Sequence, residues 1–233
     1  MTPYYDDGSC VIYHGDCRDV LPTLSTVDCV ITDPPYGIGF TYPGAEYVDS
    51  VTAYGEWMWN AIEMAEMTCS PKGGIAVFQS AKHARNWPMW FPREWRLIAI
   101  PKVFVQMNTA LVTWATDYVL YWPMPDAPVG RQDWQPQPAR DWFVSYETAI
   151  PRRGHERDHP CPRPHDMMRF LVSILAAPSA IVLDPFMGSG TTLVAAKRLG
   201  RKAIGIELEE KYCEIAAKRL AQGALYLFGE AAC

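Results

Sequence analysis

The chain has 233 residues, of which 49% are hydrophobic and 20% charged, and this composition is typical of one globular domain with a full core. No apolar run approaches the roughly 18 residues of a membrane span, and the first residues lack the basic and apolar regions of a signal peptide. We therefore expect a cytoplasmic protein without membrane contact. The net charge of −5 gives no overall attraction to nucleic acid, but residues 1–80 hold 11 acids and two bases, so any nucleic-acid surface should follow residue 80.

Seven cysteines contain no Cys-x-x-Cys pair, which indicates reduced thiols. In the N-terminal part, Val11–Tyr13 is predicted to be a strand followed by the turn His14-Gly15-Asp16-Cys17, and one helical turn is expected near residues 19–24. The apolar run Val27–Ile31 then predicts a buried strand, which ends at Asp33-Pro34-Pro35-Tyr36.

The two prolines at the end of this run forbid continued strand pairing and an immediate helix. Asp33 and Tyr36 are therefore left at the carboxyl end of a strand, where open α/β sheets bind ligands. A carboxylate, a fixed Pro34 carbonyl and a flat ring form a receptor for a planar group that carries an NH2. The alternative is an ordinary Pro-Pro turn with a surface acid.

The middle of the chain alternates between predicted helices and strands. A loop is expected at 37–52, and the tryptophans at 57, 59, 87, 90 and 95 are expected in the core. Helices are predicted at 53–69 and 81–87, and strands at 75–78, 96–105 and 117–122.

Nine of the 20 prolines fall in residues 123–164, so this stretch can be neither a long helix nor a central strand. We interpret about 120–158 as a short target-recognition insertion, whose arginines would contact phosphate; a solvated loop is the alternative. A zinc site at His155, His159, Cys161 and His165 is disfavoured by the intervening prolines, and no metal is expected.

The last third of the chain is predicted to be a βαβα unit. Its elements are a helix at 166–177, strands at 181–183 and 203–206, and helices at 193–199 and 209–221. Together, about seven strands with intervening helices imply an α/β fold with one Rossmann-like, doubly wound and mostly parallel sheet, in a single domain over residues 1–233.

Gly188-Ser189-Gly190 lies between a predicted strand and helix, where glycines let a ligand approach the backbone. Glu207 ends the next strand and could accept hydrogen bonds from both ribose hydroxyls. The turn lacks the third glycine of the NAD fingerprint and a following Gly-Lys-Ser/Thr, which favours a nucleoside without a phosphate chain, such as S-adenosylmethionine. A plain tight turn with a capping side chain is the alternative.

These motifs together resemble the amino-methylating DNA methyltransferases, which modify adenine N6 or cytosine N4. The resemblance rests on Asp33-Pro34-Pro35-Tyr36 and on the segment from Asp184 to Thr192. His14-Gly15-Asp16-Cys17 and Ile204–Glu207 resemble further family motifs. His159-Pro160-Cys161-Pro162-Arg163-Pro164 resembles the family's His-Pro-x-x-Lys-Pro segment, with Arg163 in place of the lysine. The order, catalytic motif first, is that of the circularly permuted β group.

The resemblance implies a role for each matching residue. Asp33 and the Pro34 carbonyl would accept the hydrogens of the target amino group, Pro35 would complete the rigid motif, and Tyr36 would stack on a base flipped out of duplex DNA. The strands before Asp33 and Asp184 would be neighbours. The residues implied to bind S-adenosyl-L-methionine are Asp16, Cys17, Asp184, Phe186, Gly188, Ser189, Gly190, Thr191 and Glu207.

The resemblance favours adenine N6 as the target, because aspartate before Pro-Pro-Tyr is commoner in adenine enzymes and serine in cytosine N4 enzymes. Cytosine N4 stays open, as do RNA or a protein amide as substrate, and a module that binds cofactor or DNA without activity. We expect a bacterial or phage protein that acts as a monomer or homodimer, and a loop at 38–52 that either closes over the flipped base or packs as ordinary surface.

Overall fold

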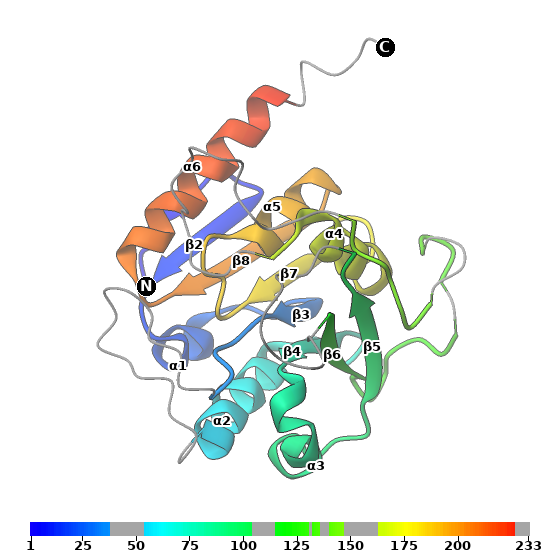
Figure 1. Cartoon of the computed structure of the whole chain (residues 1–233). Helices are drawn as coiled ribbons and strands as arrows, with labels where there is room; N and C mark the ends of the chain where they lie inside the picture. The colour runs from blue at the N-terminus through cyan, green and yellow to red at the C-terminus, as the bar shows by residue number, and fades with distance from the viewer. Residues whose placement is uncertain (38–53, 104–114, 131, 136–139, 147–162, 227–233) are drawn as a thin grey trace, which may run out of the picture.

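The computed structural model describes residues 1–37, 54–103, 115–130, 132–135, 140–146 and 163–226, which form a layered α/β structure around one sheet (Figure 1). The sheet has eight strands in the order β1-β2-β8-β7-β3-β4-β6-β5. The strands are β1 (Tyr5–Asp6), β2 (Cys10–His14), β3 (Cys29–Thr32), β4 (Gly74–Gln79), β5 (Arg96–Pro101), β6 (Thr116–Pro123), β7 (Ile181–Asp184) and β8 (Lys202–Glu207).

The five central strands, β2, β8, β7, β3 and β4, are parallel, and the strands at both ends of the sheet are antiparallel. The predicted α/β, mostly parallel fold class is confirmed. The strand count of seven was one too low, because β1 has only two residues and no period-2 pattern can be read from so short a segment.

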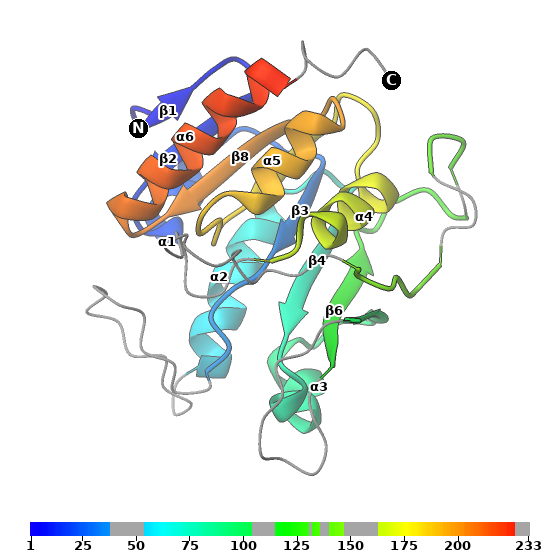
Figure 2. The ribbon, with the colours of Figure 1, turned by 45° about the horizontal axis from the view of Figure 1, so that its top comes forward.

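Helices cover both faces of the sheet, as a doubly wound fold requires (Figures 1 and 2). One face packs against α1 (Cys17–Val20), α2 (Tyr54–Thr68) and α3 (Trp87–Trp90). The other packs against α4 (His165–Leu175), α5 (Thr191–Arg198) and α6 (Glu210–Tyr226).

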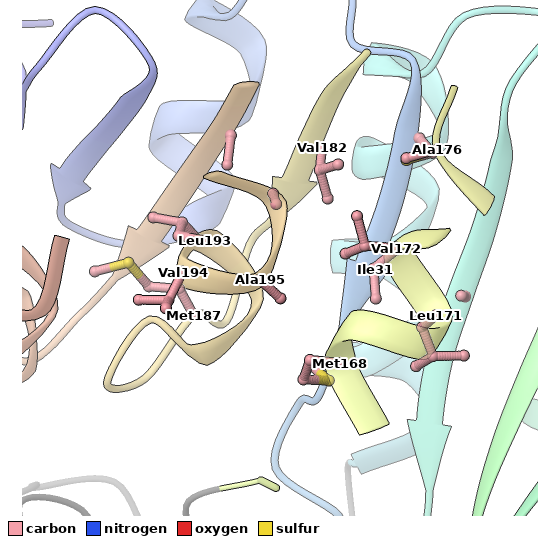
Figure 3. Close-up of a cluster of buried hydrophobic side chains, with 14 of the residues drawn as sticks. Ile31, Met168, Leu171, Val172, Ala176, Val182, Met187, Leu193, Val194 and Ala195 are labelled. Carbon is pink, nitrogen blue, oxygen red and sulfur yellow. The ribbon is translucent and has the colours of Figure 1, made fainter. Parts of the chain in front are cut away.

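The core between the sheet and α4 shows how helical spacing gathers apolar side chains on the face of α4 that meets the sheet (Figure 3). Met168, Leu171 and Val172 recur at intervals of three and four residues, so they share one face of α4 and are at most 2% exposed. They pack in one cluster with Ile31 of β3 and Val182 of β7. Each buried side chain of this size contributes roughly 2 kcal/mol of hydrophobic stabilisation, which fixes α4 beneath the two strands that end at the predicted motifs.

Two predicted elements differ from the structure. The helix expected at 81–87 is a 3-10 segment, Ala81–Asn86, followed by α3, because Pro88 can stand only in the first turn of a new helix. The strand expected at 96–105 ends at Pro101. Of the five tryptophans expected in the core, Trp87 and Trp90 are buried, whereas the other three, Trp57, Trp59 and Trp95, are partly buried against it.

The described part of the proline-rich stretch lies against the edge of the sheet. β6 continues to Pro123, so the excursion begins after this residue rather than at residue 120. Two single-residue bridges then join it to the β5 side, between Ala99 and Trp142 and between Lys102 and Ser145.

Five cysteines of the described chain, at positions 10, 17, 29, 69 and 213, are buried free thiols, as predicted for reduced cysteines; Cys161 and Cys233 lie outside the described residues. Within the described ranges, no helix has the length and apolar character needed to cross a bilayer.

Candidate active site

The predicted site residues lie along one edge of the sheet, at the carboxyl ends of neighbouring strands. β3 pairs in parallel with β7 through Cys29–Val182 and Val30–Leu183, as the sequence predicted. At their ends the Thr32 hydroxyl donates a hydrogen bond to Asp184 Oδ1 over 2.7 Å, which ties the two motif-bearing strands together. Two motifs about 150 residues apart in sequence are thus adjacent in space.

At the end of β3, the Asp33-Pro34-Pro35-Tyr36 segment places a carboxylate beside an aromatic ring. Pro34 is buried, whereas Asp33, Pro35 and Tyr36 are partly exposed. The Tyr36 hydroxyl donates a hydrogen bond to Asp33 Oδ1. Asp33 and Tyr36 thus lie together at the strand end where the planar-amine receptor was predicted.

The Asp33 carboxylate is also paired with Arg163. Its Oδ2 accepts from Nε of Arg163 at 2.6 Å and its Oδ1 from Nη2 at 2.9 Å, a two-pronged ion pair. The sequence suggested only that Arg163 retains a cation in place of the family's lysine. Its contact with Asp33 joins residues 130 positions apart, so no local signal announces it.

At the end of β7 the chain turns tightly through glycines into α5. Gly188 and Gly190 have φ of +50° and +77°, which glycine adopts without steric cost. A Cβ atom on Gly190 would lie 2.8 Å from Cβ of Ala216, so α6 packs directly against the turn. Burial raises the pKa of Asp184 to about 6, although hydrogen bonds from Thr192, Thr32 and the Phe186 N–H lower it.

Glu207 closes the next strand, β8, and reaches back to the glycine turn. Its two carboxylate oxygens accept one backbone N–H each, from Gly188 and from Glu209, both at 2.9 Å. A carboxylate offers about four lone-pair sites, so sites are left for two hydroxyl donors. Burial raises the pKa of Glu207 to about 7, against the lowering effect of these two N–H groups. The two remaining acceptor sites fit the vicinal hydroxyls of a ribose, which would donate to them.

The turn after β2 lies on the far side of Glu207. His14 is level with Glu207 in the paired strands, and the Gly15 N–H donates to the Glu207 carbonyl over 2.9 Å. Asp16 caps α1 by accepting from the Arg18 N–H and also pairs with the Arg18 side chain, while Cys17 is 5% exposed. The structure thus brings all predicted cofactor residues to one edge, spread over β2, β8 and β7.

Three further residues in this region were missed in the sequence. Arg219 of α6 donates to Ser189 Oγ at 2.9 Å and to Thr191 Oγ1 at 3.3 Å, so these hydrogen bonds connect α6 to the glycine turn. The ring of Trp57 in α2 packs against Phe186, with 5.7 Å between centroids. Asp117 of β6 accepts from Arg163. An antiparallel strand begins at the edge where its parallel neighbour ends, so an acid at the start of β6 was a usable signal.

Several predicted features fall outside the described residues. These are the loop at 38–52, the arginines at 152, 153 and 157, and three of the four suggested zinc ligands, His155, His159 and Cys161. The fourth, His165, begins α4 and lies 3.3 Å from Nη2 of Arg219.

The open α/β sheet brings the Asp33 motif and the glycine turn to adjacent strand ends, the place where such sheets bind ligands. The family model for DNA methylases that modify N6 or N4 amino groups matches residues 27–218, so the chain belongs to this family. Its members use S-adenosyl-L-methionine, which confirms the predicted cofactor.

Curated relatives and solved structures agree with this assignment. The chain is 26% identical to the type II methyltransferase M.ScaI of Streptomyces caespitosus, over 97% of this chain and 86% of that protein. It is 30% identical to the putative methylase YubD of Escherichia coli K12, over 89% of this chain and 88% of the relative. The crystal structure of the M1.HpyAVI–SAM complex superposes with a TM-score of 0.69 at 25% identity, covering 91% of this chain and 98% of that one.

Proposed function

We propose that this DNA methyltransferase transfers a methyl group from S-adenosyl-L-methionine to the exocyclic N6 amino group of adenine, at a specific sequence in duplex DNA. The observation that carries the proposal is the adjacency of Asp33 and the Asp184 turn on β3 and β7, tied by the 2.7 Å hydrogen bond from Thr32. This arrangement sets an amine-accepting group beside a cofactor turn.

An aromatic amino group is a poor nucleophile, because its lone pair is delocalised into the ring. Asp33 and the Pro34 carbonyl would accept its two hydrogens and draw them out of the ring plane, which returns electron density to nitrogen. Tyr36 would hold the base by stacking. The bound cofactor supplies an electrophilic methyl group on a sulfonium. The protein contributes mainly positioning and local electrostatics.

The cofactor would extend along the edge from β2 to β7. In this proposal Asp16 and Cys17 contact its adenine, and Glu207 accepts from its ribose hydroxyls. The turn residues Asp184, Phe186, Gly188, Ser189, Gly190 and Thr191 line its remaining part. The support is their common position at neighbouring strand ends and the hydrogen bond between Gly188 and Glu207.

DNA recognition is assigned to the excursion after β6. In its described part, the Arg140 guanidinium lies 4.8 Å from the centroid of the Trp142 ring, and Trp142 and Tyr146 are 45% and 69% exposed. A cation and exposed rings suit phosphate and base contacts. The target base must leave the duplex to reach Asp33. With chromosomal or phage DNA as substrate, the protein would act in the cytoplasm of a bacterium.

The test is to incubate the purified protein with S-adenosyl-L-methionine and duplex DNA, digest the DNA, and identify methylated nucleosides by mass spectrometry. We expect N6-methyladenine. N4-methylcytosine alone would reverse the target base, and the absence of both would overturn the proposal. Methylation of RNA or protein in preference to DNA in a competition assay would also contradict it.

A further inference from the structure

Asp33 stands at the end of a chain of four alternating charges. Lys102 donates from Nζ to Asp117 Oδ1 at 3.0 Å, Asp117 Oδ2 accepts from Nη1 of Arg163 at 2.8 Å, and Arg163 pairs with Asp33 at 2.6 Å. The four side chains come from segments far apart in sequence: after β5, within β6, before α4 and after β3. Their exposed fractions lie between 16% and 27%, so each charge depends on its neighbours.

The three nitrogens of the Arg163 guanidinium are divided between two carboxylates. Nε and Nη2 hold the two oxygens of Asp33, while Nη1 points to Asp117. The planar fork also lies over the Phe78 ring, with the guanidinium carbon 4.9 Å from its centroid. Through Nη1, Asp117 ties the rigid fork, and with it the carboxylate of Asp33, to strand β6.

Asp117 can serve as this anchor at neutral pH. Burial raises the pKa of its carboxyl, but the positive charges of Arg163 and Lys102 outweigh burial and bring the pKa below its ordinary value. Asp117 is therefore ionised wherever the enzyme acts. Arg163 stays charged as well, since burial alone would lower its pKa but Asp117 and Asp33 raise it well above its usual value.

We propose that Asp117 is a positioning residue for the methyl-transfer step, which acts through Arg163 to orient the carboxylate of Asp33. The proposal rests on the function proposed above, in which Asp33 accepts a hydrogen of the target amine. Asp33 Oδ1 accepts from both Arg163 and the Tyr36 hydroxyl, so the free lone pair is on Oδ2, and its direction is set by how the Arg163 fork is held.

Asp117 also connects the proposed target-recognition segment to Asp33. Asp117 lies in β6, the strand that leads into the target-recognition excursion. Lys102 follows β5 and is bridged to Ser145 of the same excursion. If DNA binding moved this edge of the sheet, the displacement would reach Asp33 through the ion pairs of Lys102, Asp117 and Arg163.

The test compares wild type with Asp117→Asn and Lys102→Met, using label transferred from S-adenosyl-L-methionine to duplex DNA. We expect kcat to fall roughly tenfold to a hundredfold in Asp117→Asn, since small misplacements of a reacting group have costs of that order. The KM for DNA and the affinity for cofactor should stay within about twofold. Lys102→Met should change kcat in the same direction by a smaller factor.

The matched control is Asp7→Asn, which removes the partly buried ion pair between Asp7 and Lys197, remote from the site. It should lower the melting temperature as much as Asp117→Asn does but leave kcat unchanged. Because Asp117 acts through Arg163, Asp117→Asn should reduce kcat little further in an Arg163→Lys background. If the two substitutions instead reduce kcat independently, so that their factors multiply in the double variant, the proposal is overturned.

An unchanged kcat in Asp117→Asn would also overturn it, as would a loss confined to KM or to thermal stability. If Asp117→Asn does not fold, Lys102→Met decides by the same criteria. Total label is counted whichever base is methylated, so a cytosine product would refute the adenine assignment and leave this proposal standing. If the product is N6-methyladenine but the Asp117 and Lys102 variants keep the wild-type kcat, this proposal is refuted and the adenine assignment stands.

Discussion

Glu207 is the residue through which we expect the proposed cofactor site to respond to pH. Its carboxylate is held by two backbone N–H groups and is packed among neighbours that raise its pKa from the ordinary 4.5 to about 7. We therefore expect the free protein to bind a proton at Glu207 as the pH falls through about 7. Ribose hydroxyls donate hydrogen bonds, and only the ionised carboxylate accepts them fully.

Cofactor and proton therefore compete for Glu207, and this sets the sign of the pH dependence. We predict that affinity for S-adenosyl-L-methionine falls as the pH is lowered from about 8 to about 6. Glu207→Gln should weaken binding by roughly tenfold or more at pH 8, because hydrogen bonds to a charged group contribute about 1.5–3 kcal/mol, and should remove most of the pH dependence. Isothermal titration calorimetry measures both effects. An affinity that rises on acidification would contradict this assignment.

The glycine turn from β7 into α5 combines a left-handed backbone conformation with close packing against α6. Gly190 combines a φ of +77° with a gap too small for a Cβ atom, because Ala216 would lie 2.8 Å away. Gly200, just past the end of the same helix, has a similar φ of +71° but open space around it. The two positions thus separate backbone strain from crowding.

We predict that Gly200→Ala lowers the free energy of unfolding by about 1–2 kcal/mol, the cost of a left-handed conformation for a non-glycine residue. Gly190→Ala should cost clearly more and should weaken cofactor binding, whereas Gly200→Ala should bind normally. Urea denaturation and titration with S-adenosyl-L-methionine check this pair. Equal stability losses with unchanged cofactor binding in both variants would show that α6 does not constrain the turn.

Elements with a strong local pattern could be predicted, and those set by distant pairing could not. The apolar runs of β3 and β7 and the turns after them are visible in the sequence, so the neighbouring strands and both motifs were predicted. Asp117 starts a strand that was predicted, but its place at the site can be inferred only when that strand is also known to run antiparallel to β4. Arg219 lies on an ordinary amphipathic helix, and only the packing of α6 against the turn reveals its contacts.

At the scale of the whole molecule, the sheet topology brings together two segments that are far apart in the sequence. The catalytic motif follows the third strand in sequence and the cofactor turn follows the seventh, yet the two strands are neighbours in the sheet. Parallel pairing makes both motifs emerge at the same edge. The motif order expected from the family resemblance is therefore compatible with one spatial site, in which the proposed methyl donor would lie beside the acceptor.

This topology separates the two halves of the site chemically. Asp33 and Tyr36 lie at the end of β3, whereas Glu207 and the glycine turn lie at the ends of β8 and β7. A change confined to Asp33 should therefore affect the transfer step and leave the cofactor half intact.

The most direct measurement is methyl transfer to duplex DNA by Asp33→Ala, made alongside its affinity for S-adenosyl-L-methionine. We predict that transfer is abolished, because the carboxylate that draws a hydrogen of the amine is gone, while cofactor binding stays close to that of wild type. A transfer rate equal to that of wild type would contradict the role of Asp33 and the account built on it.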